Sequence, residues 1–255
     1  MPSCPLWIVR RPRLPCLLAT LLFACGCSRK APDAAAKAEL KCSEGMVLVP
    51  TGPFNYGRRR APIRAQTQRD KDGQVDLFAP THAPETFIAP LKTIKETLPA
   101  FCIDKYEYPN RTGTRPRVGL TWMEAAALCR KAGKRLCTEY EWEKACRGTS
   151  GQDYPYGRRF RPGACALLID EPGAYVSGSC PQCKSPYGAY DMSGGVWEWT
   201  MNRYDPVSGR EERVLRGGAL SGDKRRSSAC SFRMAGVPGG VRPLVGVRCC
   251  SSPSE

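Results

Sequence analysis

Fifteen cysteines in 255 residues constrain this chain more than any other feature of its sequence. Disulfide bonds persist in exported proteins, whereas cytosolic thiols are kept reduced. If Cys25 is acylated, as argued below, twelve cysteines follow it, an even number that can pair completely. If Cys27 is acylated instead, eleven follow and one is left over. We therefore expect an exported domain that is held together by disulfides.

The N-terminus has the pattern of an export signal. A basic stretch at positions 10–13 precedes an apolar run at 14–24, which is too short to span a bilayer. The run ends Leu-Phe-Ala-Cys at Cys25, which is similar to the bacterial lipobox, where cleavage leaves a lipid-modified cysteine. Cys27 is a second candidate for lipidation, with Gly26 before it, but we favour Cys25 because Leu22 and Ala24 stand where the lipobox has a leucine and a small residue.

These signals divide the N-terminal region into two segments. We expect a signal peptide over residues 1–24 and a lipidated N-terminus with a polar, alanine-rich tether over 25–41. The protein would then be attached to a cell membrane or outer membrane through its lipid, and the sequence does not distinguish between the two. A simple cleaved signal and an uncleaved anchor remain alternatives.

The net charge of +15 favours anionic partners. Removal of the three arginines before position 14 lowers it to 15 − 3 = +12. Lipid headgroups, acidic glycans and nucleic acid all carry negative charge, but no motif that reads DNA or RNA accompanies the charge. We therefore expect no nucleic-acid partner.

Two helices are predicted by matching capping boxes, in which a threonine and a glutamate three residues later satisfy each other's backbone. The first runs from Thr121 to about Ala132, and the second from Thr138 to about Arg147. Each is followed by a glycine, a common helix stop. Both carry cysteines on their inner faces, which indicates bridges to other elements.

The remaining chain predicts short strands and turns. Residues 46–54 and 101–110 have the apolar or alternating patterns of strands. Residues 56–99 show no clear periodicity and begin with an arginine cluster, so we interpret them as a basic surface insertion. One domain is expected over 42–250, followed by a short tail over 251–255.

A glycine turn in the stretch 187–200 is a candidate cation site. Asp191 and Glu198 flank the turn, whose glycines permit backbone conformations that direct carbonyl oxygens inward. A hard cation such as Ca²⁺ prefers oxygen-only ligands of this kind. From position 196 the residues alternate, which places Trp197 and Trp199 on the face opposite Glu198. The alternative interpretation is an ordinary glycine turn before a core strand.

The pair Cys180-Pro-Gln-Cys183 has the spacing of a redox motif or of half a zinc site. A zinc site needs a second pair of ligands, and His82 is the only histidine in the chain. We therefore expect structural disulfides here, with Cys165 bonded to either Cys180 or Cys183.

A set of collinear motifs resembles the sulfatase-modifying-factor family, whose best-known member is the formylglycine-generating enzyme. The motifs that carry the resemblance are Met46-Val-Leu-Val-Pro-Thr-Gly-Pro-Phe54, Asp104-Lys-Tyr-Glu107, Gly133-Lys-Arg-Leu-Cys-Thr-Glu-Tyr-Glu-Trp-Glu143, Tyr154-Pro-Tyr-Gly157, Tyr187-Gly-Ala-Tyr-Asp-Met-Ser-Gly-Gly-Val-Trp-Glu-Trp-Thr200, Arg216-Gly-Gly218 and Val245-Gly-Val-Arg-Cys249. The resemblance implies an α+β fold of the C-type-lectin-like type, with two helices, twisted antiparallel strands and much irregular loop.

The resemblance also implies ligands and bridges. A structural Ca²⁺ would be held by the side chains of Asp191 and Glu198 and by the carbonyls of Gly194 and Val196. Two disulfides of the eukaryotic-type enzyme transfer by motif as Cys129 with Cys249 and Cys146 with Cys230.

One departure from the family bears on activity. The formylglycine-generating enzyme oxidises a substrate cysteine with Cu(I) held by two thiolates five residues apart, just after the Gly-Gly motif. Here the resemblance places Gly222 and Ser227 at those positions. Copper as a cofactor is therefore not expected, because Cu(I) favours soft thiolate ligands. A shifted alignment could bring in only Cys230.

The region that lines the family's substrate groove is basic here. From Arg210 to Arg248 there are nine basic and three acidic residues, a net of 9 − 3 = +6. The groove candidates are Arg216, Gly222, Ser227 and Arg233. The alternative is that several arginines pair with core carboxylates such as Glu139, Glu141 and Glu143.

We therefore expect a membrane-anchored lipoprotein that acts as a non-catalytic or divergent scaffold for a protein or anionic polymer. The alternative is a formylglycine-generating oxidase that acts on a cysteine of an exported substrate.

Overall fold

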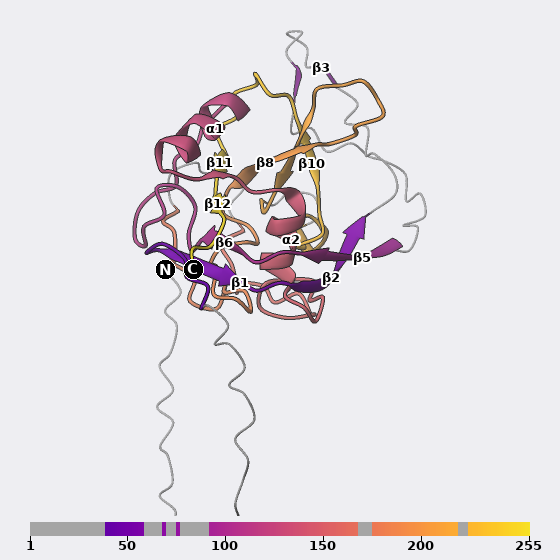
Figure 1. Ribbon diagram of the computed structural model, residues 1–255. Coiled ribbons are helices and arrows are strands. Elements are labelled where there is room, and N and C mark those ends of the chain that lie inside the picture. The colour runs from indigo at the N-terminus through magenta and orange to yellow at the C-terminus, as the bar shows by residue number, and fades with distance from the viewer. Residues whose placement is uncertain (1–38, 59–67, 70–74, 77–91, 168–174, 219–223) are drawn as a thin grey trace, which may run out of the picture. The chain divides into compact units, whose positions relative to one another are not determined.

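The computed structural model describes residues 39–58, 68–69, 75–76, 92–167, 175–218 and 224–255 (Figure 1). These residues form one compact unit, Glu39–Glu255. The predicted signal peptide and Cys25 lie outside the described residues. Within them, no helix has the length and apolar character needed to cross a membrane.

A four-stranded antiparallel sheet brings the two ends of the domain together. Its order is β1 (Met46–Val49), β6 (Phe101–Asp104), β12 (Cys249–Ser251) and β7 (Arg135–Leu136). Beyond it, the backbones of Lys41 and Ser254 exchange two hydrogen bonds of 2.8 and 2.9 Å. The pairing adds Lys41, from the predicted tether, and Ser254, from the predicted 251–255 tail, to the structure around the predicted 42–250 domain. Polar terminal residues gave no sign of it.

A second sheet has the order β10 (Met234–Gly236), β9 (Arg213–Arg216), β8 (Trp197–Arg203) and β11 (Val245–Val247). The pairing of β11 with β8 is parallel and the other two pairings are antiparallel. Trp197 and Trp199 enter one apolar cluster with Leu215 and Val247, as their shared face on β8 predicts.

Both predicted helices are present with their capping boxes. Helix α1 spans Trp122–Lys131 with Thr121 as N-cap, and α2 spans Glu139–Arg147 with Thr138 as N-cap. The inner-face residues Trp142, Ala145 and Cys146 are buried. A short third helix, α3 (Lys224–Ser227), was not predicted, because one turn is too short to show helical periodicity.

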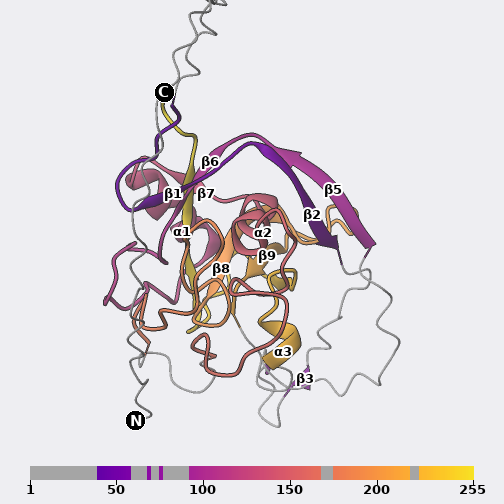
Figure 2. The ribbon, with the colours of Figure 1, turned by 90° about the horizontal axis from the view of Figure 1, so that it is seen from below.

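The predicted insertion over 56–99 was too wide at both ends. Strands β2 (Gly52–Arg58) and β5 (Lys92–Leu98) pair antiparallel along seven residues and form a long two-stranded ribbon (Figure 2). Tyr56 on this ribbon is 2% exposed. Strand pairing across more than 30 intervening positions leaves no local signal in either segment. The two-residue strands β3 (Gln68–Arg69) and β4 (Val75–Asp76) also pair with each other.

The strand predicted over 101–110 ends at Asp104. After it, the chain turns, with a cis bond between Tyr108 and Pro109 and a positive φ of 61° at Asn110. The Asn110 amide donates to the Gly45 carbonyl at 2.8 Å, which holds the turn beside β1. The alternating side chains of 105–110 therefore belong to a turn whose polar contacts replace sheet pairing.

Five disulfides connect the elements within the described residues. Cys129 is bonded to Cys249 and Cys146 to Cys230, the two pairs that the resemblance implied. The adjacent Cys250 is bonded to Cys137, so β12 is joined to both α1 and the chain before α2. The remaining bridges are Cys42–Cys102 and Cys165–Cys183. A bridge that closes a loop of about 100 residues can contribute on the order of 4 kcal/mol in the chain-entropy model.

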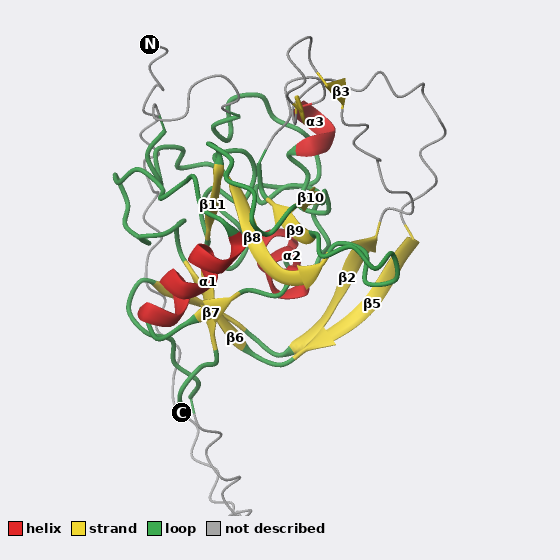
Figure 3. Cartoon of the chain, turned by 90° about the horizontal axis from the view of Figure 1, so that it is seen from above, coloured by secondary structure: helices red, strands yellow, loops and turns green. Residues whose placement is uncertain are grey.

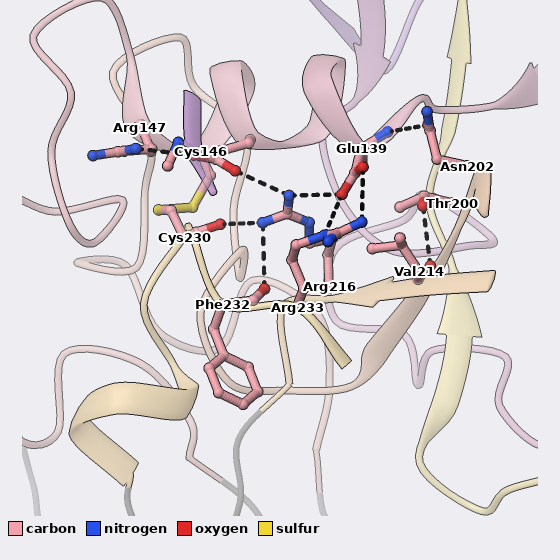
Figure 4. Close-up of polar contacts among 12 residues, drawn as sticks. Glu139, Cys146, Arg147, Thr200, Asn202, Val214, Arg216, Cys230, Phe232 and Arg233 are labelled. Carbon is pink, nitrogen blue, oxygen red and sulfur yellow. Dashed lines mark hydrogen bonds and ion pairs between the residues drawn. A yellow bond between two sulfur atoms is a disulfide. The ribbon is translucent and has the colours of Figure 1, made fainter. Parts of the chain in front are cut away.

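A buried ion-pair network joins α2 to β9. Arg216 is fully buried, and its Nη2 lies 3.1 Å from Glu139 Oε2 and 2.9 Å from Glu143 Oε2 (Figure 4). Its Nη1 donates to the carbonyls of Cys230 and Phe232, at 3.0 and 3.3 Å. Burial alone would lower the pKa of the Arg216 guanidinium, but Glu143 and the other acidic groups around it outweigh that effect and raise it.

Two further arginines complete the network. Arg233 donates to both oxygens of Glu139, at 2.7 and 3.0 Å. Arg147 donates to Glu143 Oε1 at 2.9 Å and to the Asn55 carbonyl of β2 at the same distance. Burial raises the pKa of the Glu143 carboxyl, and Arg216 is the first of the groups that oppose this. Three arginines thus surround two carboxylates at the centre of the domain.

We predict that Arg216→Met destabilises the fold by about 3 kcal/mol or more, because the loss of one partner leaves buried carboxylates without their main counter-ion. The matched control is Arg203→Met. Arg203 pairs with Glu211 on the surface, with side chains 43% and 61% exposed, and its loss should cost about 1 kcal/mol or less. Chemical denaturation with disulfides intact measures both. Equal effects of the two variants would contradict a central role for the network.

Candidate functional site

The two positions that the motif resemblance assigns to the family's copper ligands are Gly222, before α3, and Ser227, within it. Ser227 is the last residue of α3 and is 2% exposed. Gly222 lies outside the described residues. Cys230, the one cysteine that a shifted alignment could supply, is bonded to Cys146. Neither Ser227 nor a bridged cysteine can act as a thiolate ligand.

The groove candidates Arg216 and Arg233 serve the network described above. Arg216 has no exposed side-chain surface, and Arg233 is only 12% exposed and donates to Glu139. Glu139 and Glu143 thus pair with arginines as the alternative interpretation anticipated, and Glu141 pairs with Arg135 at 2.6 Å. The positive charge of Arg216 and Arg233 is therefore balanced inside the protein.

The predicted cation turn has the backbone that its glycines indicated. Asp191, Gly194 and Gly195 have positive φ values of 61°, 83° and 62°. The N–H of Gly194 donates to the Gly217 carbonyl and that of Gly195 to the Ala166 carbonyl, both at 2.6 Å. A side chain at Gly194 would also meet the Ala166 backbone, so this position needs glycine for both conformation and space.

The two carboxylates of the turn differ in their partners. Glu198 is fully buried and accepts from Trp142 Nε1 at 2.6 Å and from Arg248 Nη2 at 2.9 Å. Asp191 accepts from the Gly178 N–H through Oδ2 at 2.6 Å. Its buried Oδ1 accepts no hydrogen bond of good geometry among the described residues, although the Tyr175 hydroxyl lies near enough to lower the pKa of Asp191. An acceptor left open in this way is compatible with a cation ligand.

A third buried carboxylate, Glu107, lies beside this turn. It accepts from the hydroxyls of Tyr175 at 3.0 Å and Ser177 at 2.6 Å. Burial raises its pKa to about 8, Arg248 opposes that rise, and Asp191 and Glu198 add to it. Burial also raises the pKa of Asp191, against the donated Gly178 N–H. Glu107, Asp191 and Glu198 thus lie near one buried arginine, Arg248, so the acidic side chains of this cluster outnumber the basic ones.

This arrangement fits a hard cation in its chemistry. The available donors are oxygens, which suit Ca²⁺. Among the residues that the structure describes, however, no three His, Cys, Asp or Glu side chains converge as a metal-binding group. A cation would therefore take much of its coordination from main-chain carbonyls, as the assignment of Gly194 and Val196 supposes.

Sequence reasoning missed Glu107 and Arg248 as members of this cluster. Both lie in motifs that carry the family resemblance, Asp-Lys-Tyr-Glu and Val-Gly-Val-Arg-Cys, and this was the only sequence feature that could have pointed to them. Arg248 donates to the carbonyls of Asp104 and Tyr190 as well as to Glu198, which links β6, the turn and β8. In the Cys180-Pro-Gln-Cys183 motif, Cys183 is bonded to Cys165, so it is not available as a zinc ligand.

Comparisons with known proteins agree with this architecture. The chain is 38% identical over 152 residues to the mouse protein named inactive C-alpha-formylglycine-generating enzyme 2, an alignment that covers 54% of this chain and 49% of that protein. It is 30% identical over 162 residues to mouse formylglycine-generating enzyme, covering 52% and 43%. The chain thus spans about half the length, or less, of these curated relatives.

The fold also matches solved structures. PvdO from Pseudomonas aeruginosa superposes with a TM-score of 0.54 at 20% identity, covering 80% of this chain and 93% of that one. This confirms the predicted fold class, a mixed α+β domain of the formylglycine-generating-enzyme type. The family model described as sulfatase-modifying factor enzyme 1-like domain matches residues 31–253. The chain therefore belongs to the sulfatase-modifying factor family.

Proposed function

We propose that this protein is an exported, membrane-anchored lipoprotein whose sulfatase-modifying-factor domain is a non-catalytic scaffold for a protein or polymer partner. What carries the proposal is the chemistry of the residues at the two positions that the resemblance assigns to copper, Gly222 and Ser227. A glycine and a buried serine stand there, and neither supplies the soft thiolate that Cu(I) favours.

The disulfide pattern supports the same conclusion. Cys230 lies three residues after Ser227, but its sulfur is bonded to Cys146 of α2. Recruitment of this thiol would require the loss of a bridge between α2 and the chain before β10. The similarity to a relative named as inactive is consistent with a family member that has kept the fold without the oxidase chemistry.

Export is supported by five disulfides within the described domain. Bridges in this number indicate an oxidising compartment. The anchor rests on the lipobox-like residues before Cys25.

A structural Ca²⁺ at the Asp191 turn is part of the proposal. Burial is the main cause of the raised pKa values of Glu107 and Asp191, and the neighbouring carboxylates add to it against Arg248. The Oδ1 of Asp191 accepts no hydrogen bond among the described residues. A divalent cation would supply positive charge and stabilise the ionised carboxylates. Its role would be to hold the turn between β8 and the loop that carries Asp191.

A test for catalysis uses a cysteine-containing peptide, reductant, Cu(I) and oxygen. We expect no formylglycine in the peptide by mass spectrometry, because the thiolate pair is missing. A formylglycine-generating enzyme treated in parallel is the positive control. Conversion of the peptide above the protein-free background would contradict the non-catalytic assignment.

The anchor can be tested in cells with two matched variants. We expect Cys25→Ser to abolish lipid attachment and release the protein from the membrane fraction, and Cys27→Ser to leave both unchanged. Mass spectrometry of the mature N-terminus measures the modification. Lipid on the Cys25→Ser protein would show that Cys27 or another anchor is used.

Calcium should raise the melting temperature of the wild-type domain relative to the protein in excess chelator. A hundredfold excess over the dissociation constant stabilises by about 2.7 kcal/mol, on the order of 5–10 °C for a domain of this size. Asp191→Gly should lose this response, since glycine accepts the φ of 61° but lacks the carboxylate. The cation assignment fails if wild type does not respond to millimolar Ca²⁺, or if Asp191→Gly responds fully.

A further inference from the structure

The loop over residues 154–161 contacts α3. Figure 3 shows α3 at the periphery of the domain, away from the sheet that contains β6 and β7. The hydroxyl of Tyr154 donates to the Arg225 carbonyl at 2.8 Å. The Tyr154 and Phe160 rings lie 5.6 Å apart, and the Arg225 guanidinium lies 6.0 Å from the centre of the Phe160 ring. Residues about 65 positions apart in sequence are therefore neighbours here.

Five exposed basic side chains lie in this loop and in α3, and we term them the basic cluster. Its members are Arg158, Arg159, Arg161, Lys224 and Arg225. None of them forms an ion pair with a carboxylate of the described residues. In this they differ from Arg147, Arg216 and Arg248, whose charges are each balanced by a buried glutamate.

Aromatic rings lie beside two of these arginines, Arg161 and Arg225. The Arg161 guanidinium lies 4.7 Å from the centre of the Tyr156 ring, and its Nη2 donates to the Tyr156 carbonyl at 3.1 Å. Tyr156 in turn stacks on Tyr154, with ring centres 5.4 Å apart and planes inclined by 4°. Arg158 Nη2 donates to the Ser150 carbonyl at 3.2 Å. A guanidinium held near a ring loses less freedom on binding, and its remaining N–H groups can contact an anion.

We propose that the basic cluster binds an anionic polysaccharide that carries sulfate or carboxylate groups. This inference rests on the scaffold function proposed above and names the chemical class of its partner. Guanidinium forks match both groups geometrically. Cations contributed by two segments at fixed positions suit a polymer whose negative groups repeat at short intervals. The half-buried rings of Tyr156 and Phe160 add apolar edges against which sugar C–H groups can pack.

Other polyanions fit this surface less well. Peptides are commonly recognised by addition to a strand edge or by anchors in an apolar groove, and the cluster lies on a loop and a one-turn helix. Insertion into a membrane surface uses exposed apolar side chains. The large apolar residues most exposed in the described chain all lie elsewhere: Met123, Met201, Val207, Val237 and Val241.

The experiment measures binding of the mature domain to immobilised heparin, which carries sulfates, and to polygalacturonate, which carries carboxylates, at 150 mM salt, about physiological ionic strength. The test variant is Arg158→Ser/Arg159→Ser/Arg161→Ser. The matched control is Arg111→Ser/Arg115→Ser/Arg117→Ser, which removes three exposed arginines from another loop and changes the net charge equally. We expect at least a tenfold loss of affinity for the test variant and less than a twofold loss for the control.

A charge-preserving variant, Phe160→Ala, separates held arginines from net charge alone. It removes the ring beneath Arg225 and should weaken binding about threefold at unchanged charge. Thermal melts of all variants establish that they fold.

Three outcomes overturn the proposal. Equal losses of affinity in the test and control triple variants would indicate non-specific attraction. Competition by polyglutamate as strong as that by heparin would indicate an acidic protein as the partner, and binding to phosphatidylglycerol vesicles without glycan binding would indicate a membrane. Formylglycine formation is scored separately and bears on the scaffold function, so the failure of one proposal is distinguishable from the failure of the other.

Discussion

The fold depends on buried arginines that pair with glutamates between elements far apart in sequence. Arg216 joins β9 to Glu139 and Glu143 of α2, and Arg248 joins the last strands to Glu198 of β8. Such pairs are costly to desolvate, so they require well-formed hydrogen bonds on every side. Main-chain carbonyls supply most of them, to Nη1 of Arg216 and to both Nη atoms of Arg248, whereas the Nε of Arg216 has no partner among the described residues. The disulfides close the same framework, with Cys146–Cys230 running from α2 to the chain that accepts from Arg216.

The same interior bears on the proposed absence of the family's oxidase chemistry. The bridge of Cys230 to Cys146 keeps one sulfur in the framework, while Ser227 ends a one-turn helix with its side chain buried. The segment that carries copper in the family is thus structural in the part described here. What α3 offers to solvent is positive charge, from Lys224 and Arg225. The proposed anion-binding surface and the proposed absence of a thiolate site are therefore compatible with each other.

The sequence predicted those parts of the fold whose causes are local. Thr121 and Thr138 cap α1 and α2 because each capping box lies within four residues. The bridges of Cys129 and Cys146 followed from motif resemblance and not from spacing. Partners that meet only in three dimensions were not accessible: β2 pairs with β5 across a long intervening segment, and Ser254 pairs with Lys41. Composition likewise could not separate Arg216, which is buried and paired, from Arg225, which is exposed.

The measurement that tests the central claim most directly is copper retention by the purified mature domain with its disulfides intact. The protein is incubated with Cu(I), desalted and assayed for bound metal, and its thiols are alkylated with and without copper. We predict that wild type retains no copper and shows no pair of copper-protected thiols, whereas Gly222→Cys/Ser227→Cys acquires both. Stoichiometric copper on the wild-type protein, protecting two thiols, would contradict the account and restore the oxidase interpretation.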